Sequence, residues 1–194
     1  MGNVPPTRPW LLLDVDGPLN PDRPGPATIA TGYTRHHVAD DTGHVYPMWL
    51  NPLHGTWLAP LLAHHDGALN AIWATTWGAH ANRAIAPLVG LPQDLPAITW
   101  PGGYRALQTR HPLAARHSWK TDIIGAWASN HGEPFIWVDD EVNRHTKRRL
   151  IEDHHLTNFA LVHVHRDEGL KPKHIDLIRH HAEVLTNHPS APPD

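Results

Sequence analysis

The stretch Leu11-Leu12-Leu13-Asp14-Val15-Asp16-Gly17 decides how the rest of the chain is interpreted. Trp10 and the three leucines are typical of a buried strand, and two carboxylates follow that strand at once. An ionised carboxylate is costly to bury unless it is paired or holds a metal, so we expect the pair where the strand leaves the sheet. Asp14 and Asp16 are two residues apart, which places their side chains on the same side of an extended chain. An ordinary strand followed by an Asp-Gly turn gives the same pattern, so the interpretation needs support from the rest of the chain.

The composition indicates one globular domain. Of the 194 residues, 40% are hydrophobic and 18% are charged, which is unlike a disordered chain and allows a sizeable core. The formal net charge of −3 leaves no basic footprint for non-specific nucleic-acid binding. The sequence contains no cysteine, which excludes disulfides, thiolate nucleophiles and thiolate metal ligands.

Nothing in the sequence suggests export or insertion into a membrane. Residues 1–9 lack a long apolar stretch after a basic start, so no signal peptide is expected. No apolar run approaches the roughly 20 residues that span a bilayer. We therefore expect a cytoplasmic protein without a membrane partner, and the sequence leaves the oligomeric state open.

The chain contains 19 histidines, many of them in adjacent pairs. Adjacent residues on a helix do not share a face, and the pairs lack the spacing of metal ligands. We therefore interpret most of them as surface residues. His163 and His165 lie two apart on a predicted strand and could share a face, so a histidine site for Zn²⁺ or Ni²⁺ stays an alternative.

Short apolar stretches alternate with amphipathic ones along the chain. Five stretches are predicted as strands: residues 10–14, 70–75, 97–100, 135–138 and 159–164. Strands that alternate with amphipathic helices are typical of a mostly parallel sheet with helices on both faces. We predict an α/β fold, a Rossmann-like three-layer sandwich around a mostly parallel five-stranded sheet.

A β-hairpin is predicted around residues 30–50. Two β-prone stretches flank Asp40-Asp41-Thr42-Gly43, and an Asp/Gly-bearing turn between such stretches favours a hairpin. The hairpin follows the first strand closely and could form a small flap over its end. No repeat or change of composition suggests a domain boundary, so we predict one domain over residues 1–187 and a Pro-rich flexible tail over residues 188–194.

Polar residues follow three of the predicted strands. Asp14 and Asp16 follow the first, Thr75 the second, and Asp139 and Asp140 the fourth. If the strands are parallel, these residues meet at the edge of the sheet where open α/β folds keep their sites. Four carboxylates there would repel one another without a cation, and an all-oxygen ligand set points to Mg²⁺. Lys120, in the first turn of a helix that Ser118 can cap, could join them and complete a cradle for a phosphate group.

In this order and context the motifs resemble those of the haloacid dehalogenase-like (HAD) hydrolase superfamily, over most of the chain. Asp14-Val15-Asp16-Gly17 is similar to the first motif, Thr75 to the Ser/Thr of the second, Lys120 to the lysine of the third and Asp139-Asp140 to the acidic fourth. The chain would be a compact phosphatase-type member with a minimal cap. The stretch from Asp14 to Asn20 and the Glu168-Gly169-Leu170 turn also resemble small phosphatase domains associated with RNA repair.

The resemblance implies a Mg²⁺-dependent phosphoric monoester hydrolase. Asp14 would attack phosphorus to form an aspartyl-phosphate, and Asp16 would protonate the leaving oxygen and then activate water. Thr75 and Lys120 would hold the transferring phosphoryl oxygens. Asp14, the backbone carbonyl of Asp16 and Asp139 would hold Mg²⁺, with support from Asp140. The substrate would be a phosphorylated small molecule such as a nucleotide, or a nucleic-acid end phosphate.

Several roles have alternatives. Thr76 could replace Thr75, and Arg105, Arg110 or Arg116 could supply the charge assigned to Lys120. The acids at 139–141 could simply begin a helix, where negative charge is favourable. Trp77 is a candidate for stacking on a base or ring.

Other functions are compatible with the same motifs. A phosphotransferase or a binding module that has lost turnover would keep this fold. Dehalogenation needs no metal, so the acidic pair at 139–140 argues against it. The substrate would be selected by the hairpin, residues 101–117 and residues 165–167, none of which carries a motif that identifies it.

Overall fold

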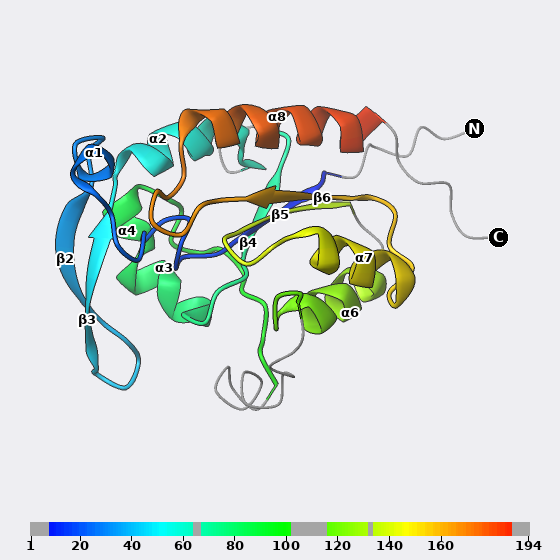
Figure 1. The fold of residues 1–194 in the computed structure, drawn as a ribbon, viewed down its shortest axis with the longest axis horizontal. Coiled ribbons are helices and arrows are strands. Elements are labelled where there is room, and N and C mark those ends of the chain that lie inside the picture. The colour runs from blue at the N-terminus through cyan, green and yellow to red at the C-terminus, as the bar shows by residue number, and fades with distance from the viewer. Residues whose placement is uncertain (1–7, 64–66, 102–115, 132–133, 188–194) are drawn as a thin grey trace.

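The computed structural model describes residues 8–63, 67–101, 116–131 and 134–187. Its centre is a four-stranded sheet in the order β4-β1-β5-β6, in which all three pairings are parallel (Figure 1). The strands are β1 (Trp10–Leu13), β4 (Asn70–Trp73), β5 (Phe135–Asp139) and β6 (Phe159–His163). The predicted α/β fold with a parallel sheet is therefore confirmed.

The predicted five-stranded sheet is not confirmed, because the stretch at 97–100 pairs only briefly. Ala97 forms an isolated parallel bridge with Trp73. Two hydrogen bonds hold it, from the Trp73 amide to the Pro96 carbonyl and from the Ile98 amide to the Trp73 carbonyl, both 2.9 Å. Pro96 and Pro101 bracket the stretch, and proline has no amide hydrogen to continue a ladder. The edge of the sheet therefore ends at β4 among the described strands.

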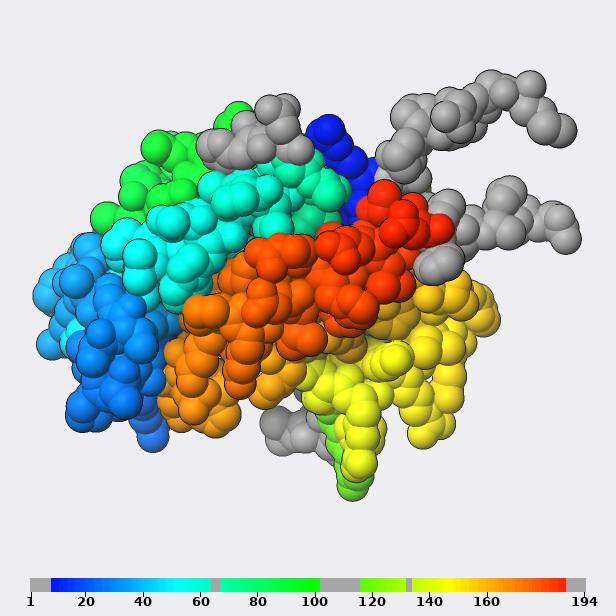
Figure 2. Space-filling model, turned by 90° about the horizontal axis from the view of Figure 1, so that it is seen from above, coloured from blue at the N-terminus to red at the C-terminus, as the bar shows by residue number. Residues whose placement is uncertain are grey.

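Helices cover both faces of the sheet. On one face lie α2 (Leu53–Leu58), η1 (Ala59–Leu61), α3 (Ala81–Ala84), α4 (Ala86–Val89) and α8 (Pro172–Asn187). On the other lie α6 (Thr121–His131) and α7 (Arg144–Glu152). Leu11 and Leu13 belong to the first core and Leu12 to the second, because successive strand side chains point to opposite faces. Figure 2 shows α8 and α2 side by side on the first face.

The predicted hairpin around 30–50 is confirmed. β2 (Thr34–Ala39) and β3 (Val45–Leu50) pair antiparallel, and the short helix α1 (Pro26–Ile29) precedes them. In the turn, Asp40 Oδ1 accepts hydrogen bonds from the amides of Thr42 and His44, both 2.9 Å. Met48 is buried in the first core, so the hairpin packs onto the domain. It stands at the end of the molecule where the parallel strands end (Figure 1).

Some predictions concern residues whose structure is not described. Arg105, Arg110 and the Pro-rich tail at 188–194 lie outside the described ranges. The predicted domain limits stay a prediction. Within the described part of the chain, no helix has the length and apolar character needed to cross a membrane.

Candidate active site

The carboxyl ends of neighbouring strands bring the predicted acids together. Leu13 of β1 is in register with Val138 of β5, and the ladder continues where the Asp14 amide donates to the Val138 carbonyl at 3.1 Å. Asp14 therefore leaves β1 beside Asp139, the last residue of β5. The edge of the sheet where the sequence predicts the site thus carries both acids.

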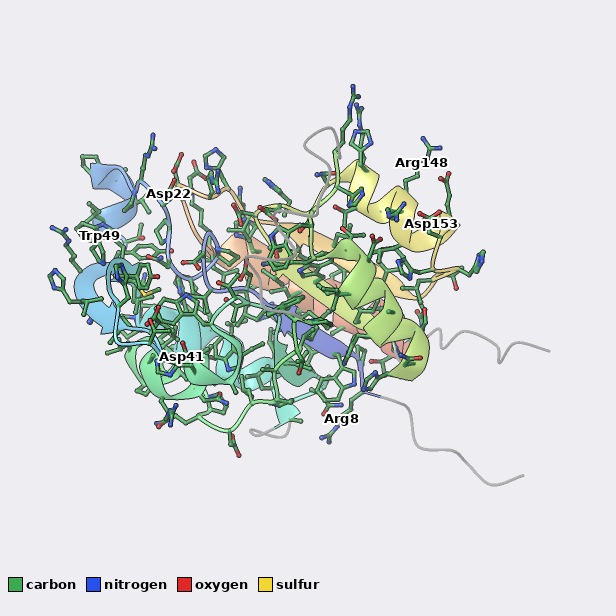
Figure 3. All side chains as sticks on the ribbon, turned by 90° about the horizontal axis from the view of Figure 1, so that it is seen from below. Arg8, Asp22, Asp41, Trp49, Arg148 and Asp153 are labelled. Carbon is green, nitrogen blue, oxygen red and sulfur yellow. The ribbon has the colours of Figure 1, made fainter. Side chains whose placement is uncertain are left out.

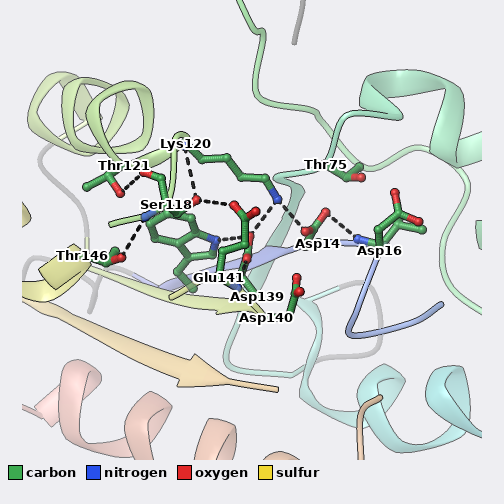
Figure 4. Close-up of polar contacts among 12 residues, drawn as sticks. Asp14, Asp16, Thr75, Ser118, Lys120, Thr121, Asp139, Asp140, Glu141 and Thr146 are labelled. Atoms are coloured by element: carbon green, nitrogen blue, oxygen red, sulfur yellow. Dashed lines mark hydrogen bonds and ion pairs between the residues drawn. The ribbon is translucent and has the colours of Figure 1, made fainter. Parts of the chain in front are cut away.

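Lys120 lies between these two acids as a buried ammonium. Its Nζ donates to Asp14 Oδ2 at 2.5 Å and to Asp139 Oδ2 at 2.8 Å (Figure 4). The three side chains are only 4%, 6% and 0% exposed, respectively. Burial alone would lower the pKa of Lys120, but the two carboxylates raise it above its ordinary value. The lysine therefore stays charged.

The remaining oxygens of the two acids are also satisfied. The Val15 amide donates to Asp14 Oδ1 at 2.8 Å, and the Glu141 amide donates to Asp139 Oδ1 at 2.7 Å. The Trp137 indole adds a bond to Asp139 Oδ2 at 3.1 Å. Both carboxylates are therefore held in one orientation before any ligand arrives.

Hydrogen bonds through Ser118 connect the backbone at Lys120 to the loop after β5. Ser118 Oγ accepts from the Lys120 amide at 3.3 Å and donates to Glu141 Oε2 at 2.9 Å. Thr146 of α7 accepts the Ser118 amide at 3.3 Å. Lys120 directly precedes α6 instead of lying in its first turn, and its carbonyl accepts the Ile124 amide at 3.0 Å. Sequence reasoning missed the supporting roles of Glu141 and Thr146, since side-chain contacts between separate segments leave no local pattern.

Asp14, Asp139 and Asp140 form a group that fits a divalent cation. Each offers one carboxylate oxygen, and the three atoms lie within 4.8 Å of one another. It is the one group of three or more acidic, histidine or cysteine ligands found in the described part of the chain, and neither His163 nor His165 belongs to it. Three carboxylate oxygens are a donor set that suits Mg²⁺.

Electrostatics at this group also favour a cation. Burial raises the pKa of Asp14 well above its ordinary range, with Asp139 and Asp16 adding to the effect and Lys120 opposing it. Burial, Asp139 and Glu141 raise the pKa of Asp140 to about 6, although Arg166 lies 3.4 Å from Asp140 Oδ2. Among the described residues of the site, the acids Asp14, Asp16, Asp139, Asp140 and Glu141 outnumber the cations Lys120 and Arg166, and a bound cation would offset that negative charge.

Asp16 takes a different position from the other acids. Its side chain is exposed and does not belong to the group of three. Asn20 Nδ2 donates to its Oδ1 at 2.9 Å, and Trp77 Nε1 donates to its Oδ2 at 3.2 Å. The predicted metal contact through the Asp16 backbone carbonyl stays a prediction.

Gly17 lets the chain pass close to Asp140. Its φ of +89° is a left-handed conformation that side chains rarely adopt, and a Cβ there would lie 2.6 Å from Asp140 Cγ. Gly17 of the first motif therefore leaves the space that the Asp140 side chain of the fourth motif occupies.

The two threonines after β4 are separated by the fold. Thr75 is fully buried, and its Oγ1 accepts the Trp77 amide at 3.4 Å. Its carbonyl accepts the Trp100 indole at 2.7 Å. Thr76 lines the cleft described below and Thr75 does not. This arrangement favours Thr76 as the hydroxyl that faces a ligand, and the phosphate-binding role of either threonine stays a prediction.

A cleft of about 480 Å³ opens between the motif residues and the hairpin. Its described lining is Asp14, Asp16, Gly17, Asn20, Asp22, Asp40, Asp41, Tyr46, Pro47, Met48, Thr76, Trp77, His80, Trp119, Lys120, Asp140, Glu141 and Arg166. Figure 3 shows Asp22, Asp41 and Trp49 at this end of the molecule, away from Arg148 of α7 and from Asp153, which follows that helix. The hairpin thus forms one wall of the cleft.

The lysine and arginine side chains near the cleft differ in position. Lys120 lines the cleft, whereas the exposed Arg116 lies beside the cleft and does not line it. Arg166 also lines the cleft, within reach of Asp140. Sequence reasoning placed residues 165–167 among the segments that select the substrate without singling out Arg166, because an exposed arginine after a strand carries no signature of its own.

No family model, curated protein or solved structure was found to match this chain. The interpretation of the site therefore rests on its own geometry. Its strongest element is that Lys120 and Asp14, which lie 106 residues apart in the sequence, meet in a buried ion pair beside Asp139.

Proposed function

We propose that the protein is a Mg²⁺-dependent phosphomonoester hydrolase, a compact HAD-like member with a Rossmann-like core. The observation that carries the proposal is the buried ammonium of Lys120 between Asp14 and Asp139, at a place where one carboxylate oxygen each of Asp14, Asp139 and Asp140 lie within 4.8 Å of one another. A phosphate group that approaches Asp14 needs positive charge around it. Lys120 supplies positive charge there, and the three carboxylates would hold a divalent cation that adds to it.

Asp14 is the nucleophile in this proposal. A carboxylate oxygen of Asp14 attacks phosphorus, the bond from phosphorus to the leaving oxygen breaks, and protonated Asp16 gives its proton to that oxygen. Lys120 offsets the charge on the transferring phosphoryl oxygens. Asp16 suits its role because its carboxyl is exposed in the cleft, where a leaving group would lie.

Hydrolysis of the aspartyl-phosphate uses the same two acids. The Asp16 carboxylate takes a proton from water, the water oxygen attacks phosphorus, and the bond to Asp14 breaks. Inorganic phosphate leaves, and both side chains return to their starting protonation states. Mg²⁺, held by Asp14, Asp139 and Asp140, would supply Lewis-acid stabilisation of the phosphoryl oxygens.

The test is hydrolysis of p-nitrophenyl phosphate with and without Mg²⁺, by the wild type and by Asp14→Asn. We expect turnover that requires both the metal and Asp14. Asp176→Asn is the matched control, because Asp176 lies on α8 and pairs with Arg179 at 2.9 Å on the surface. Turnover that survives Asp14→Asn would refute the proposal.

Other outcomes would identify the alternatives. Mg²⁺ binding without turnover of any phosphate ester would favour a binding module. Transfer of phosphate to an added alcohol in preference to water would favour a phosphotransferase. A panel of phosphorylated sugars, nucleotides and 5′-phosphorylated oligonucleotides would then define the substrate.

A further inference from the structure

The carboxylate of Asp16 is held by two donors from separate parts of the chain. Asn20 Nδ2 contacts Oδ1 at 2.9 Å, and Trp77 Nε1 contacts Oδ2 at 3.2 Å. An exposed aspartate otherwise samples several rotamers. Each carboxylate oxygen has two lone pairs, so a donor on each still leaves room for the proton that Asp16 is proposed to carry.

Asn20 is itself firmly held. Its amide donates to the Val15 carbonyl at 2.8 Å, and its carbonyl accepts the Gly17 amide at 2.9 Å. Its side-chain oxygen accepts the Trp49 amide from β3 at 2.9 Å. That last bond sets the orientation of the side-chain amide, since only the nitrogen can then face Asp16. One side chain therefore links the hairpin to Asp16.

Trp77 makes a second link between the hairpin and Asp16. Its ring meets Tyr46 of β3 edge-on, with centroids 5.7 Å apart, and lies nearly parallel to His80 at 6.2 Å. His80, in η3 (Gly78–His80), lies with Nε2 2.9 Å from the Ala39 carbonyl at the end of β2. Both donors to Asp16 are thus packed against the hairpin.

We propose that Asn20 and Trp77 are positioning residues that aim the Asp16 carboxyl at the leaving oxygen and make that aim depend on the hairpin. The proposal rests on the proposed function, in which Asp16 is the proton donor. It predicts that loss of either donor impairs proton transfer and leaves the attack by Asp14 largely intact. Substrates whose leaving group must be protonated are therefore the sensitive ones.

The test compares p-nitrophenyl phosphate with glycerol 2-phosphate. The first releases a stable phenolate without a proton, whereas the second releases an alkoxide that must be protonated as it leaves. The variants are Trp77→Phe, which keeps an aromatic ring and removes the indole donor, and Asn20→Ala, which removes the side-chain amide that donates to Asp16. Trp127→Phe and Asn130→Ala are the matched controls, because both residues lie on α6 and outside the lining of the cleft.

We expect each test variant to slow the release of glycerol in the first turnover, before water is activated, by about 10-fold or more, a part of the 100- to 10,000-fold that a positioned acid contributes. The first-turnover release of p-nitrophenolate should slow much less, and the control variants should match the wild type with both substrates. Equal losses of first-turnover release with both substrates, or no loss with either, would overturn the positioning role. A wild type that hydrolyses neither substrate would overturn the proposed function itself.

A second measurement keeps the contact testable even if a variant is unstable. The chain has nine tryptophans, and the indole signal of Trp77 in an NMR spectrum is identified by its loss in Trp77→Phe. Asp16→Ala removes the acceptor at an exposed position and should move that signal toward higher field. A signal that does not move would show that Trp77 does not donate to Asp16 in solution, which overturns its part in the proposal.

Discussion

Replacing Lys120 with methionine removes the ammonium that lies between Asp14 and Asp139 and keeps most of the length of the side chain. The two carboxylates would then stay buried without the charge that compensates them, since their side chains are only 6% and 0% exposed. An ionised carboxylate without a compensating charge has a far higher free energy in a buried site than in water. We therefore expect a large loss of stability from a change that leaves the shape of the core nearly intact.

The size of the loss follows from the two ion pairs. Removing one partner of a buried pair typically costs about 3–5 kcal/mol, and here the two carboxylates share one ammonium at 2.5 and 2.8 Å. A domain is typically stable by about 5–15 kcal/mol, so the variant should stay folded with a much lower midpoint of unfolding. The two contacts are not additive, because the acids can take up a proton once the lysine is gone.

The assay is urea unfolding at pH 7 in the presence of a chelator, followed by tryptophan fluorescence. Lys147→Met is the matched control, because Lys147 is exposed on α7 and a surface change should alter stability by less than about 0.5 kcal/mol. Adding Mg²⁺ should restore part of the loss in Lys120→Met, since a cation at the three carboxylates replaces the missing charge. The double variant Lys120→Met/Asp139→Asn should be more stable than Lys120→Met, because one of the two buried charges is removed with the lysine.

A loss below about 1 kcal/mol for Lys120→Met, similar to the surface control, would refute this reasoning. It would mean that the ammonium and the two acids are not buried together in solution. A double variant that is less stable than Lys120→Met would contradict the charge argument specifically.

The remaining predictions concern pH, the first motif and the metal. His54 is fully buried, and burial lowers its pKa to about 4. Because the unfolded chain then binds more protons than the folded one, this histidine should lower the free energy of unfolding by roughly 3 kcal/mol as pH drops from 6.5 to 4. In His54→Phe, the midpoint of urea unfolding should therefore depend less on pH over this range. Gly17→Ala should lower stability by about 1–3 kcal/mol through its positive φ and the contact with Asp140, and a wild-type melting temperature in this variant would contradict that. Mg²⁺ should raise the melting temperature of the wild type and not that of Asp139→Asn. Scanning calorimetry with and without Mg²⁺ measures this shift in the absence of any substrate.

Local patterns explain why most of the fold was predicted from the sequence. Leu11, Leu12 and Leu13 are all buried, as a strand covered on both faces requires, and Asp14 stands at its end. The Asp/Gly-bearing turn at 40–43 predicts the hairpin, because its residues favour the backbone that the turn adopts. In each case the signal lies within a few neighbouring residues.

Contacts between distant segments explain what was missed. The stretch at 97–100 has the apolar character of a strand, but pairing also needs amide hydrogens in register with a neighbour, and the flanking prolines limit them. Thr75 and Thr76 are identical in type and adjacent in sequence, so only packing decides which one is buried. The hydrogen bond from Trp77 to Asp16 joins residues that are 61 apart in the sequence, and no pattern of residue spacing predicts it.

The sequence by itself determined that acids follow the ends of buried strands and that a lysine lies next to the start of a helix, because strand and helix signals depend on neighbouring residues. The tertiary structure alone decided that Lys120 lies between Asp14 and Asp139, that Asp140 joins them and that Asp16 faces the cleft instead. Such distinctions depend on distances of a few ångströms between side chains from separate segments. Those distances are set when the two cores pack the segments onto the sheet, and the residue order along the chain does not contain them.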